Sequence, residues 1–155
     1  MTSRQFASAI VGCVLAGMVA FAADSPQMGT WKLNEAKSKI GAGAPKNSTV
    51  VYSAAGDNVK VTVDGVDGTG KASHNEWTGK FDGKEYPVTG DAAADSRAYT
   101  KVDDKTLTFS QKKDGKITTS GKIVISADGK SRTVTTTTTG ADGKKVSSTA
   151  VYDKQ

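Results

Sequence analysis

Residues 114–153 read DGKITTSGKIVISADGKSRTVTTTTTGADGKKVSSTAVYD, and this stretch decides the fold class. The phrase Asp-Gly-Lys occurs three times in it, beginning at Asp114, Asp128 and Asp142, so that successive phrases are 14 residues apart. Asp-Gly supplies the positive φ that a tight hairpin turn requires. If about four residues form each turn, roughly ten remain for each strand, or about 33 Å of extended chain. The stretch therefore predicts long antiparallel strands joined by hairpins.

The chain before this stretch has the same character. A fourth Asp-Gly-Lys phrase begins at Asp82, and residues 58–63 alternate between polar and apolar side chains. Alternation with period 2 is typical of a strand with one buried face and one wet face. After residue 22 leucine occurs only at Leu33 and Leu107, whereas Val, Thr and Ser are abundant. Because β-branched residues favour strands, we predict an all-β fold.

We expect an antiparallel meander β-barrel of about 8–10 strands, since such long strands fit a barrel wall better than a small sandwich. Residues 34–40 predict one short helical turn with Asn34 as its N-cap, and residues 91–95 predict a loop. The expected strands are residues 30–33, 48–54, 58–64, 71–80, 84–88, 96–102, 105–112, 117–127, 131–139 and 145–153.

The first 22 residues have the features of a Sec-type signal peptide. Arg4 provides a positive start, residues 6–19 are almost all apolar or small, and Ala20-Phe21-Ala22 is a small-x-small cleavage pattern. Two alternatives are an uncleaved membrane anchor and a lipoprotein acylated at Cys13, although the apolar run continues well past Cys13. We predict a signal peptide at 1–22, one β-barrel domain at 23–155, a periplasmic or extracellular location, and no stable membrane insertion after cleavage.

Composition narrows the kinds of site that the chain can hold. With 1 Cys and 1 His it has neither a disulfide scaffold nor a site that needs two histidines, and residues 64–68 do not fit a calcium loop. Loss of Arg4 lowers the net charge from +5 to +4, and the lysines that remain alternate with aspartates. Nucleic-acid binding would need a clustered basic stripe. We therefore predict no metal, no cofactor and no nucleic-acid partner.

The apolar core predicted from these strands is thin. Several positions in phase with it are polar, namely Thr136, Ser148 and His74. Either the interior holds water or a ligand, or these residues face outward; we favour the first. Trp77, Phe81 and Tyr86 belong to the core or to the rim of a pocket. The core candidates are Trp31, Leu33, Val50, Tyr52, Val59, Val61, Val63, Trp77, Phe81, Tyr99, Leu107, Phe109, Ile117, Ile123, Ile125, Val134, Val146 and Tyr152.

The stretch Gly29-Thr30-Trp31-Lys32-Leu33 resembles the opening strand of the calycins, the lipocalin and fatty-acid-binding-protein group. The resemblance implies a barrel whose closed end is plugged by Trp31. Residues 150–154 look like the last strand of a fatty-acid-binding protein, but Ala150 stands where that group has an arginine, and only Tyr152 matches. The 34–47 segment is too short for its helical lid. The chain also resembles small secreted bacterial lipocalin-like proteins of unassigned activity.

Arg97 and Arg132 are the two arginines that follow residue 22, in a chain whose other cations are lysines. Three roles are open to them. One reaches inward to bind an anionic head group, one packs over Trp31 to close the barrel, or both lie on the surface. Arg132 would replace the arginine that the last strand lacks if it points inward.

Our leading hypothesis is a secreted calycin-like protein that binds a small hydrophobic or amphipathic ligand without catalysis. The predicted ligand-binding residues are Tyr52, His74, Tyr99, Phe109, Arg132 and Tyr152. An alternative is an envelope protein-interaction or structural module with a filled interior, acting through loops 41–47 and 90–95. A third hypothesis, a hydrolase or isomerase, would need His74 beside Glu76 inside a pocket. The sequence does not decide the oligomeric state.

Overall fold

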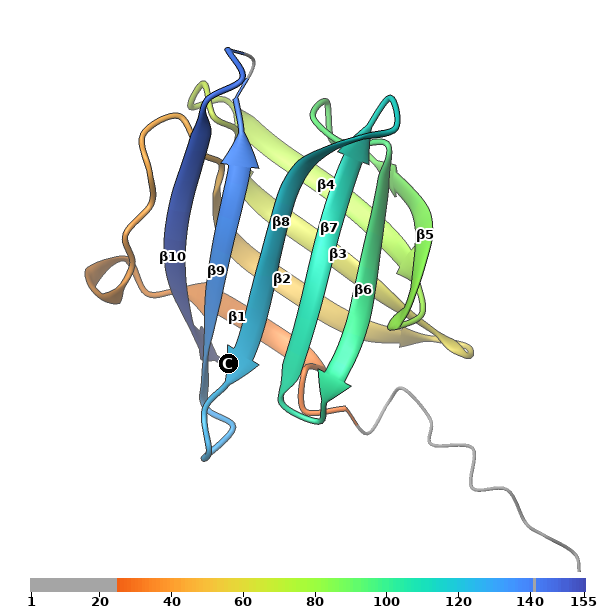
Figure 1. The fold of residues 1–155 in the computed structure, drawn as a ribbon. Coiled ribbons are helices and arrows are strands. Elements are labelled where there is room, and N and C mark those ends of the chain that lie inside the picture. Colours follow the sequence, from red (N-terminus) through yellow and green to blue (C-terminus); the bar gives the residue numbers. More distant parts are fainter. Residues whose placement is uncertain (1–24, 141) are drawn as a thin grey trace, which may run out of the picture.

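Ten strands form one closed antiparallel barrel in the computed structural model, which describes residues 25–140 and 142–155 (Figure 1). Each strand pairs with its sequence neighbour, and β1 pairs with β10 to close the barrel. The signal peptide predicted at 1–22 lies outside the described residues. The strands are β1 (Gly29–Leu33), β2 (Lys46–Ala55), β3 (Asn58–Val66), β4 (Ala72–Gly79), β5 (Asp82–Thr89), β6 (Ser96–Asp103), β7 (Thr106–Lys113), β8 (Lys116–Ile125), β9 (Ser131–Thr139) and β10 (Lys145–Lys154).

These strands confirm the predicted all-β meander. Every expected strand is present, with ends that differ by two residues at most. The predicted helical turn is the 3₁₀ helix Glu35–Lys37, and the side chain of Asn34 caps it by accepting a hydrogen bond from the Lys37 backbone N–H at 3.2 Å. Residues 34–45, all of them described, hold no other helix between β1 and β2, and Lys39 forms an isolated bridge to Thr149. None of the helical segments in the described chain is long and apolar enough to cross a lipid bilayer.

The Asp-Gly-Lys repeat has a local physical cause. In the β8–β9 turn Asp128 Oδ1 accepts a hydrogen bond from the Lys130 backbone N–H at 3.0 Å, and Gly129 between them has a φ of 72°. The β9–β10 turn repeats this contact from Asp142 to Lys144 at 3.0 Å. The aspartate thus holds the turn while glycine supplies the left-handed backbone.

One end of the barrel is closed by Arg132 and the three aromatic side chains that surround it. Its guanidinium carbon lies 4.7 Å from the ring centroid of Trp31, 4.9 Å from that of Tyr52 and 5.1 Å from that of Tyr152. Trp31 is fully buried, and its indole N–H donates to the Gln27 carbonyl oxygen at 2.8 Å. Of the three roles proposed for the arginines, Arg132 therefore takes the one that closes the barrel.

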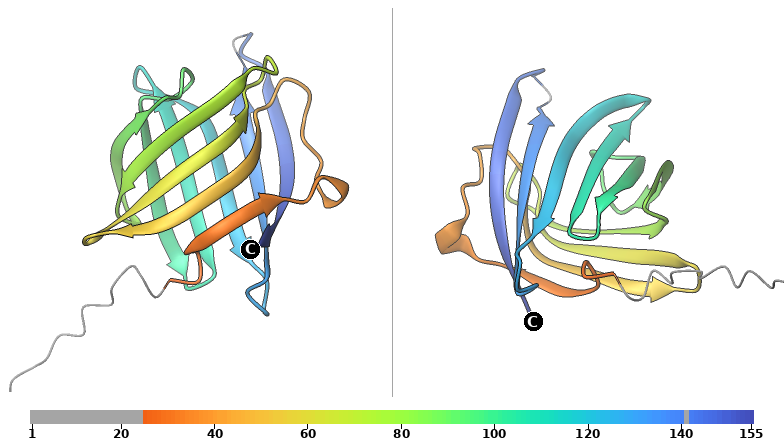
Figure 2. Two further views of the ribbon diagram at one scale, coloured as in Figure 1. Left: turned by 180° about the vertical axis from the view of Figure 1, so that it is seen from behind. Right: turned by 60° about the horizontal axis from the view of Figure 1, so that its bottom comes forward.

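A second aromatic cluster is formed by side chains from β4, from β6 and from the segment that follows β4. Trp77 stacks on Phe81 with centroids 6.4 Å apart, and Tyr99 meets Trp77 edge to face at 4.8 Å. Tyr52 joins the two clusters through an edge-to-face contact with Tyr99 at 6.3 Å. In Figure 2, β1–β4 and β7–β10 form two walls whose strands cross steeply. Tyr52, Trp77 and Tyr99 belong to the buried core, and Phe81 packs against it.

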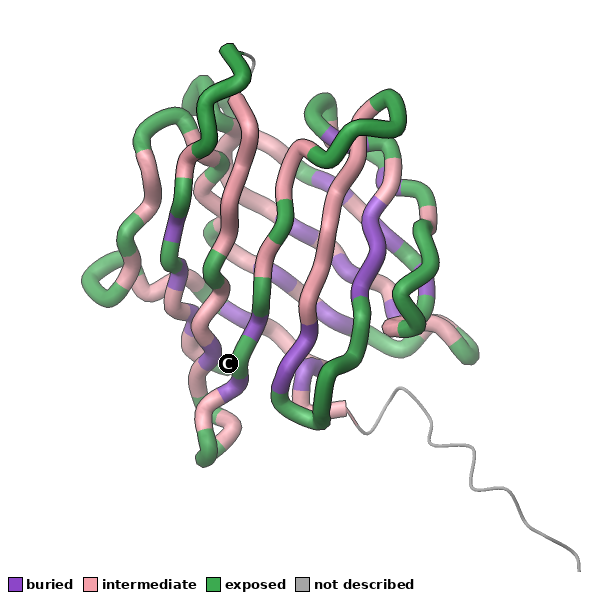
Figure 3. Tube along the Cα trace, in the orientation of Figure 1, coloured by how far each residue is buried: buried purple, intermediate pink, exposed green. Residues whose placement is uncertain are grey.

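Burial agrees with the predicted strand phase in most places. Buried and less buried residues alternate along the strands, as the colours of Figure 3 show for β3. Ile117 was predicted to lie in the core, and this is wrong, because it is 55% exposed. A bulge in the β7–β8 register between Gln111 and Lys112 breaks the alternation there, so that Ile117 pairs with Lys112.

We predict that replacing Trp31 with alanine lowers the free energy of unfolding by about 3–5 kcal/mol, because the change opens a cavity under Arg132 and removes a cation–π partner. Urea unfolding followed by circular dichroism measures the change. Val124→Ala on β8 is the control; its side chain is 40% exposed, and we expect a change within about 0.5 kcal/mol. Equal effects of the two substitutions would contradict the plug.

Candidate functional site

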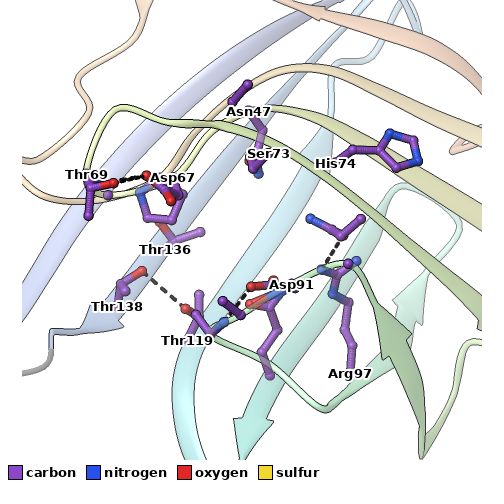
Figure 4. A pocket seen from close by; sticks show the side chains of 18 of the residues that line it. Asn47, Asp67, Thr69, Ser73, His74, Asp91, Arg97, Thr119, Thr136 and Thr138 are labelled. Atoms are coloured by element: carbon purple, nitrogen blue, oxygen red, sulfur yellow. Dashed lines mark hydrogen bonds between the residues drawn. The ribbon is translucent and has the colours of Figure 1, made fainter.

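A cavity of about 550 Å³ occupies the other end of the barrel. On β9, Arg132 belongs to the closed end, while Thr136 and Thr138, further along the same face, line the cavity. Its mouth is formed by the β3–β4 turn, residues 67–71, and the β5–β6 loop, residues 90–95. Figure 4 shows side chains from both loops and from β9 around this space. Along β9 the inward side chains therefore change from a plug residue at the closed end to cavity-lining residues at the open end.

Most of the residues that line this cavity have polar or charged side chains, although carbon atoms make up more than half of the lining surface. The hydroxyls of Thr119 and Thr138 lie 3.3 Å apart across the β8–β9 pair (Figure 4). Apolar contact comes from Phe109, Pro45 and small alanines of the loops. The lining residues are Pro45, Asn47, Asp67, Gly68, Thr69, Ala72, Ser73, His74, Asn75, Gly90, Asp91, Ala92, Ala93, Arg97, Phe109, Gln111, Thr119, Thr136 and Thr138. The threonine-rich strand β9 thus places hydroxyls on the interior as well as on the outer face.

A smaller cavity of about 60 Å³ lies beneath the large one. The two share the lining residues Asn47, Arg97, Phe109 and Gln111, so these four residues separate the aromatic floor from the polar chamber. Five of the six predicted binding residues line the smaller cavity, namely Tyr52, Tyr99, Phe109, Arg132 and Tyr152. Only Phe109 of these five also lines the larger one.

The sixth predicted residue, His74, lies at the cavity rim with its imidazole turned to the outer face. Its side chain is 56% exposed, and Figure 4 shows the ring pointing away from the cavity. Along β4, Asn75 and Trp77 are buried, so alternation directs His74 and Glu76 outward. The expectation that the His74 side chain lines the interior is corrected accordingly, and Asn75 is the β4 side chain that faces the cavity.

His74 lies between two carboxylates on that outer face. Its Nδ1 is 2.6 Å from Asp64 Oδ1, and its Nε2 is 3.6 Å from Glu76 Oε1. The hydrogen bond from Asp64, helped by Glu76, raises the pKa of His74 above its usual 6.5. His74 and Glu76 are therefore neighbours, but not inside a pocket as the hydrolase hypothesis required.

Arg97 is the interior residue that the predicted binding set lacked. It is 3% exposed, and its Nη2 donates to Asn75 Oδ1 at 3.1 Å. The Gln111 carboxamide is assigned with its oxygen toward Arg97, where it accepts from Nη2 at 2.6 Å and from Nε at 2.9 Å. A signal for Arg97 was present in the sequence, because it precedes the core residue Tyr99 by two positions and so shares its face.

Neither interior arginine has a carboxylate partner among residues 25–140 and 142–155, where the ion pairs involve lysines and His74 only. Arg97 Nη1, Arg132 Nε and Arg132 Nη1 are buried with no hydrogen-bond partner among the same residues. Burial raises the pKa of Tyr152 to about 12 and also raises that of Tyr99, so these two phenols stay neutral. The interior therefore carries positive charge that no carboxylate among the described residues neutralises.

Other functional chemistry is limited in the described chain. Residues 25–140 and 142–155 contain no group of three or more His, Cys, Asp or Glu side chains placed to hold a metal ion. Comparison of the sequence with protein-family models returns no match, and comparison with curated proteins returns none. The barrel, the cavity and the interior charge are consequently the basis for any functional proposal.

We predict that Asp64→Asn lowers the pKa of His74 toward 6.5, and that Glu76→Gln lowers it less, because the Asp64 hydrogen bond is the main cause of the shift. Histidine ring signals followed by NMR against pH give both values.

The raised pKa of His74 also affects the stability of the fold. The contact stabilises the fold fully below pH 6.5, and this stabilisation is lost as the pH rises through the raised pKa. Between these two pH values the free energy of unfolding should therefore depend less on pH in the Asp64→Asn variant than in the unsubstituted protein. An unchanged pKa in the Asp64→Asn variant would contradict this assignment.

Proposed function

We propose that this protein is a calycin-like carrier, secreted or periplasmic, that binds a small, partly apolar ligand in its barrel interior without catalysis. The observation that carries the proposal is the cavity of about 550 Å³ at the open end. A volume in this range is typical of small-molecule sites, which combine apolar walls with a few convergent polar groups. Binding and release by equilibrium capture require nothing beyond such a site.

The aromatic floor and the polar wall suit a ligand with two kinds of surface. Phe109 lines both cavities and offers an apolar face, while Thr136 and Thr138 offer hydroxyls on the adjoining wall. A ligand that displaces solvent from these hydroxyls must offer them hydrogen bonds in return, because a buried polar group without a partner is unfavourable. This is why we favour an amphipathic ligand over a purely apolar one.

The calycin assignment is supported by the closed end. Trp31, from the Gly-x-Trp strand, lies under Arg132, and its strand pairs with β2 and β10, which carry the other two rings of the plug. The ten-strand order fits the fatty-acid-binding branch better than an eight-strand lipocalin. The alternative, an interaction module, calls for a filled interior, which the large cavity does not favour.

The proposal is tested by native mass spectrometry of the gently purified mature protein, with its organic extract analysed in parallel. We expect an adduct of one ligand per protein that is lost on denaturation, and the extract then identifies its chemical class. A clean mass without an adduct, from preparations made in several growth media, would favour the interaction module.

We predict that Thr136→Phe abolishes the adduct because its ring takes up part of the space that the ligand occupies, whereas Thr135→Phe leaves it. Thr136 lines the cavity, and its neighbour Thr135 is exposed on the outer face of the same strand, so the two substitutions match in chemistry and differ in direction. Native mass spectrometry gives the bound fraction, and thermal unfolding checks that both variants fold. Retention of the adduct in the Thr136→Phe variant would place the ligand elsewhere.

A further inference from the structure

Two buried guanidinium groups set an electrostatic problem inside this barrel. Arg132 is 2% exposed and Arg97 is 3% exposed, and an arginine side chain keeps its charge inside a protein. A buried charge is strongly unfavourable unless it is paired and hydrogen-bonded. The described chain supplies no carboxylate to either group. Each arginine therefore needs its own explanation.

Arg132 is compensated by its aromatic surroundings. The rings of Trp31, Tyr52 and Tyr152 lie 4.7 to 5.1 Å from its guanidinium carbon, within the range of cation–π attraction. It lines only the small inner cavity of about 60 Å³. By comparison, about 30 Å³ is the share of one water molecule in the liquid. Arg132 is thus part of the plug and out of reach of a ligand larger than a few atoms.

Arg97 has no comparable compensation. Its guanidinium carbon is 6.0 Å from the centroid of Tyr99, at the limit of cation–π range. Its other contacts are the neutral amides of Asn75 and Gln111, and Nη1 is buried with no partner among the described residues. Arg97 also lines both cavities, so it lies at the floor of the large one. The Arg97 guanidinium, held by two neutral amides at the base of the open cavity, therefore has no anionic partner among the described residues.

We propose that Arg97, positioned by Asn75 and Gln111, binds the anionic group of the ligand, and that the ligand is a compact, hydroxyl-bearing organic anion. The proposal rests on the proposed carrier function and specifies its ligand class. Nε and Nη2 already donate to Gln111 and Asn75, so Nη1 is the Arg97 donor that remains for the anion, and an oxygen of a carboxylate or of a phosphate monoester can accept from it. The hydroxyl-bearing part of the ligand lies against Thr119, Thr136 and Thr138.

Two features of the cavity limit the size and charge of this ligand. Below Arg97 the rings of Tyr52, Tyr99 and Phe109 leave only about 60 Å³, so a long acyl chain has no space there. At the mouth, Asp67 Oδ1 accepts three hydrogen bonds from Thr69 and Lys71, which lower the pKa of this carboxyl group and keep it ionised. Asp91 caps its own loop through the Ala93 backbone N–H at 2.8 Å. A second anionic group at the mouth would meet these carboxylates, which favours a ligand with a single anionic group.

The test uses the mature protein and defined probes at constant ionic strength. Acetate and inorganic phosphate test the bare anions, gluconate and glucose 6-phosphate test hydroxylated carboxylate and phosphate, glucose is the neutral control, and decanoate tests an acyl chain. Thermal unfolding and calorimetry measure binding. We expect gluconate or glucose 6-phosphate to bind at least about tenfold more tightly than glucose and decanoate, and the better of the two identifies the anion.

Arg97→Met and Lys122→Met form a matched pair of variants. Each removes one positive charge, but Lys122 lies exposed on β8, on the outer face. We expect Arg97→Met to weaken binding of the anionic probe at least about tenfold and Lys122→Met to leave it unchanged. Arg97→Met removes a buried charge but also leaves the Asn75 and Gln111 oxygens without their donor, so thermal unfolding confirms that the variant is folded before binding is measured. Anion-dependent stabilisation of the unsubstituted protein provides a measurement that needs no variant.

The outcomes separate this inference from the carrier proposal. The Arg97 site is overturned if none of the four anions stabilises the protein, namely acetate, phosphate, gluconate and glucose 6-phosphate. It is also overturned if the Arg97→Met variant binds the anionic probe as tightly as the unsubstituted protein does. A neutral adduct in native mass spectrometry, still bound after Arg97→Met, overturns the site while the carrier proposal stands. Absence of any adduct together with absence of probe binding overturns both.

Discussion

The contact on which this barrel depends is the stacking of the Arg132 guanidinium against Trp31, Tyr52 and Tyr152. A meander pairs each strand with the next along the chain, but closure requires its first and last strands to meet. The Arg132 cluster joins side chains from β1, β2, β9 and β10 at that junction, so it packs the seam where local hairpin pairing gives no help. Burying these aromatic surfaces and compensating the charge with their rings make closure favourable.

Closing one end in this way leaves volume at the other. The inward side chains of β9 illustrate the gradient, since they pass from Arg132 through Val134 to Thr136 and Thr138. Arg97 lies between the aromatic floor and the hydroxyl-lined chamber, with its charge held by two neutral amides. The interior therefore changes along the barrel axis from aromatic rings, through the Arg97 charge, to hydroxyl groups. The placement of these polar groups, more than the apolar area, is what would select a ligand.

Several site residues could be predicted from the sequence, and others could not, for identifiable reasons. Tyr52, Tyr99, Phe109, Arg132 and Tyr152 lie in regular strands, where period-2 alternation assigns the inward face. His74 was placed inside although the core candidate Trp77, three positions further along, directs it to the opposite face by period-2 alternation. The pairing of His74 with Asp64 across β3 and β4, together with burial of Trp77, decides the matter. Ile117 was misplaced by a bulge that composition does not reveal.

By itself the sequence determined the strands, their turns and the meander, because Asp-Gly turns and alternating side chains are local properties of the chain. It also indicated that the core is thin and partly polar. Only the tertiary structure decided which end of the barrel is plugged, how large the cavity is, and that Arg97 meets Asn75 and Gln111 from neighbouring strands. These features depend on closure, which joins segments far apart in the chain, and on how side chains share a common volume, so no local pattern encodes them.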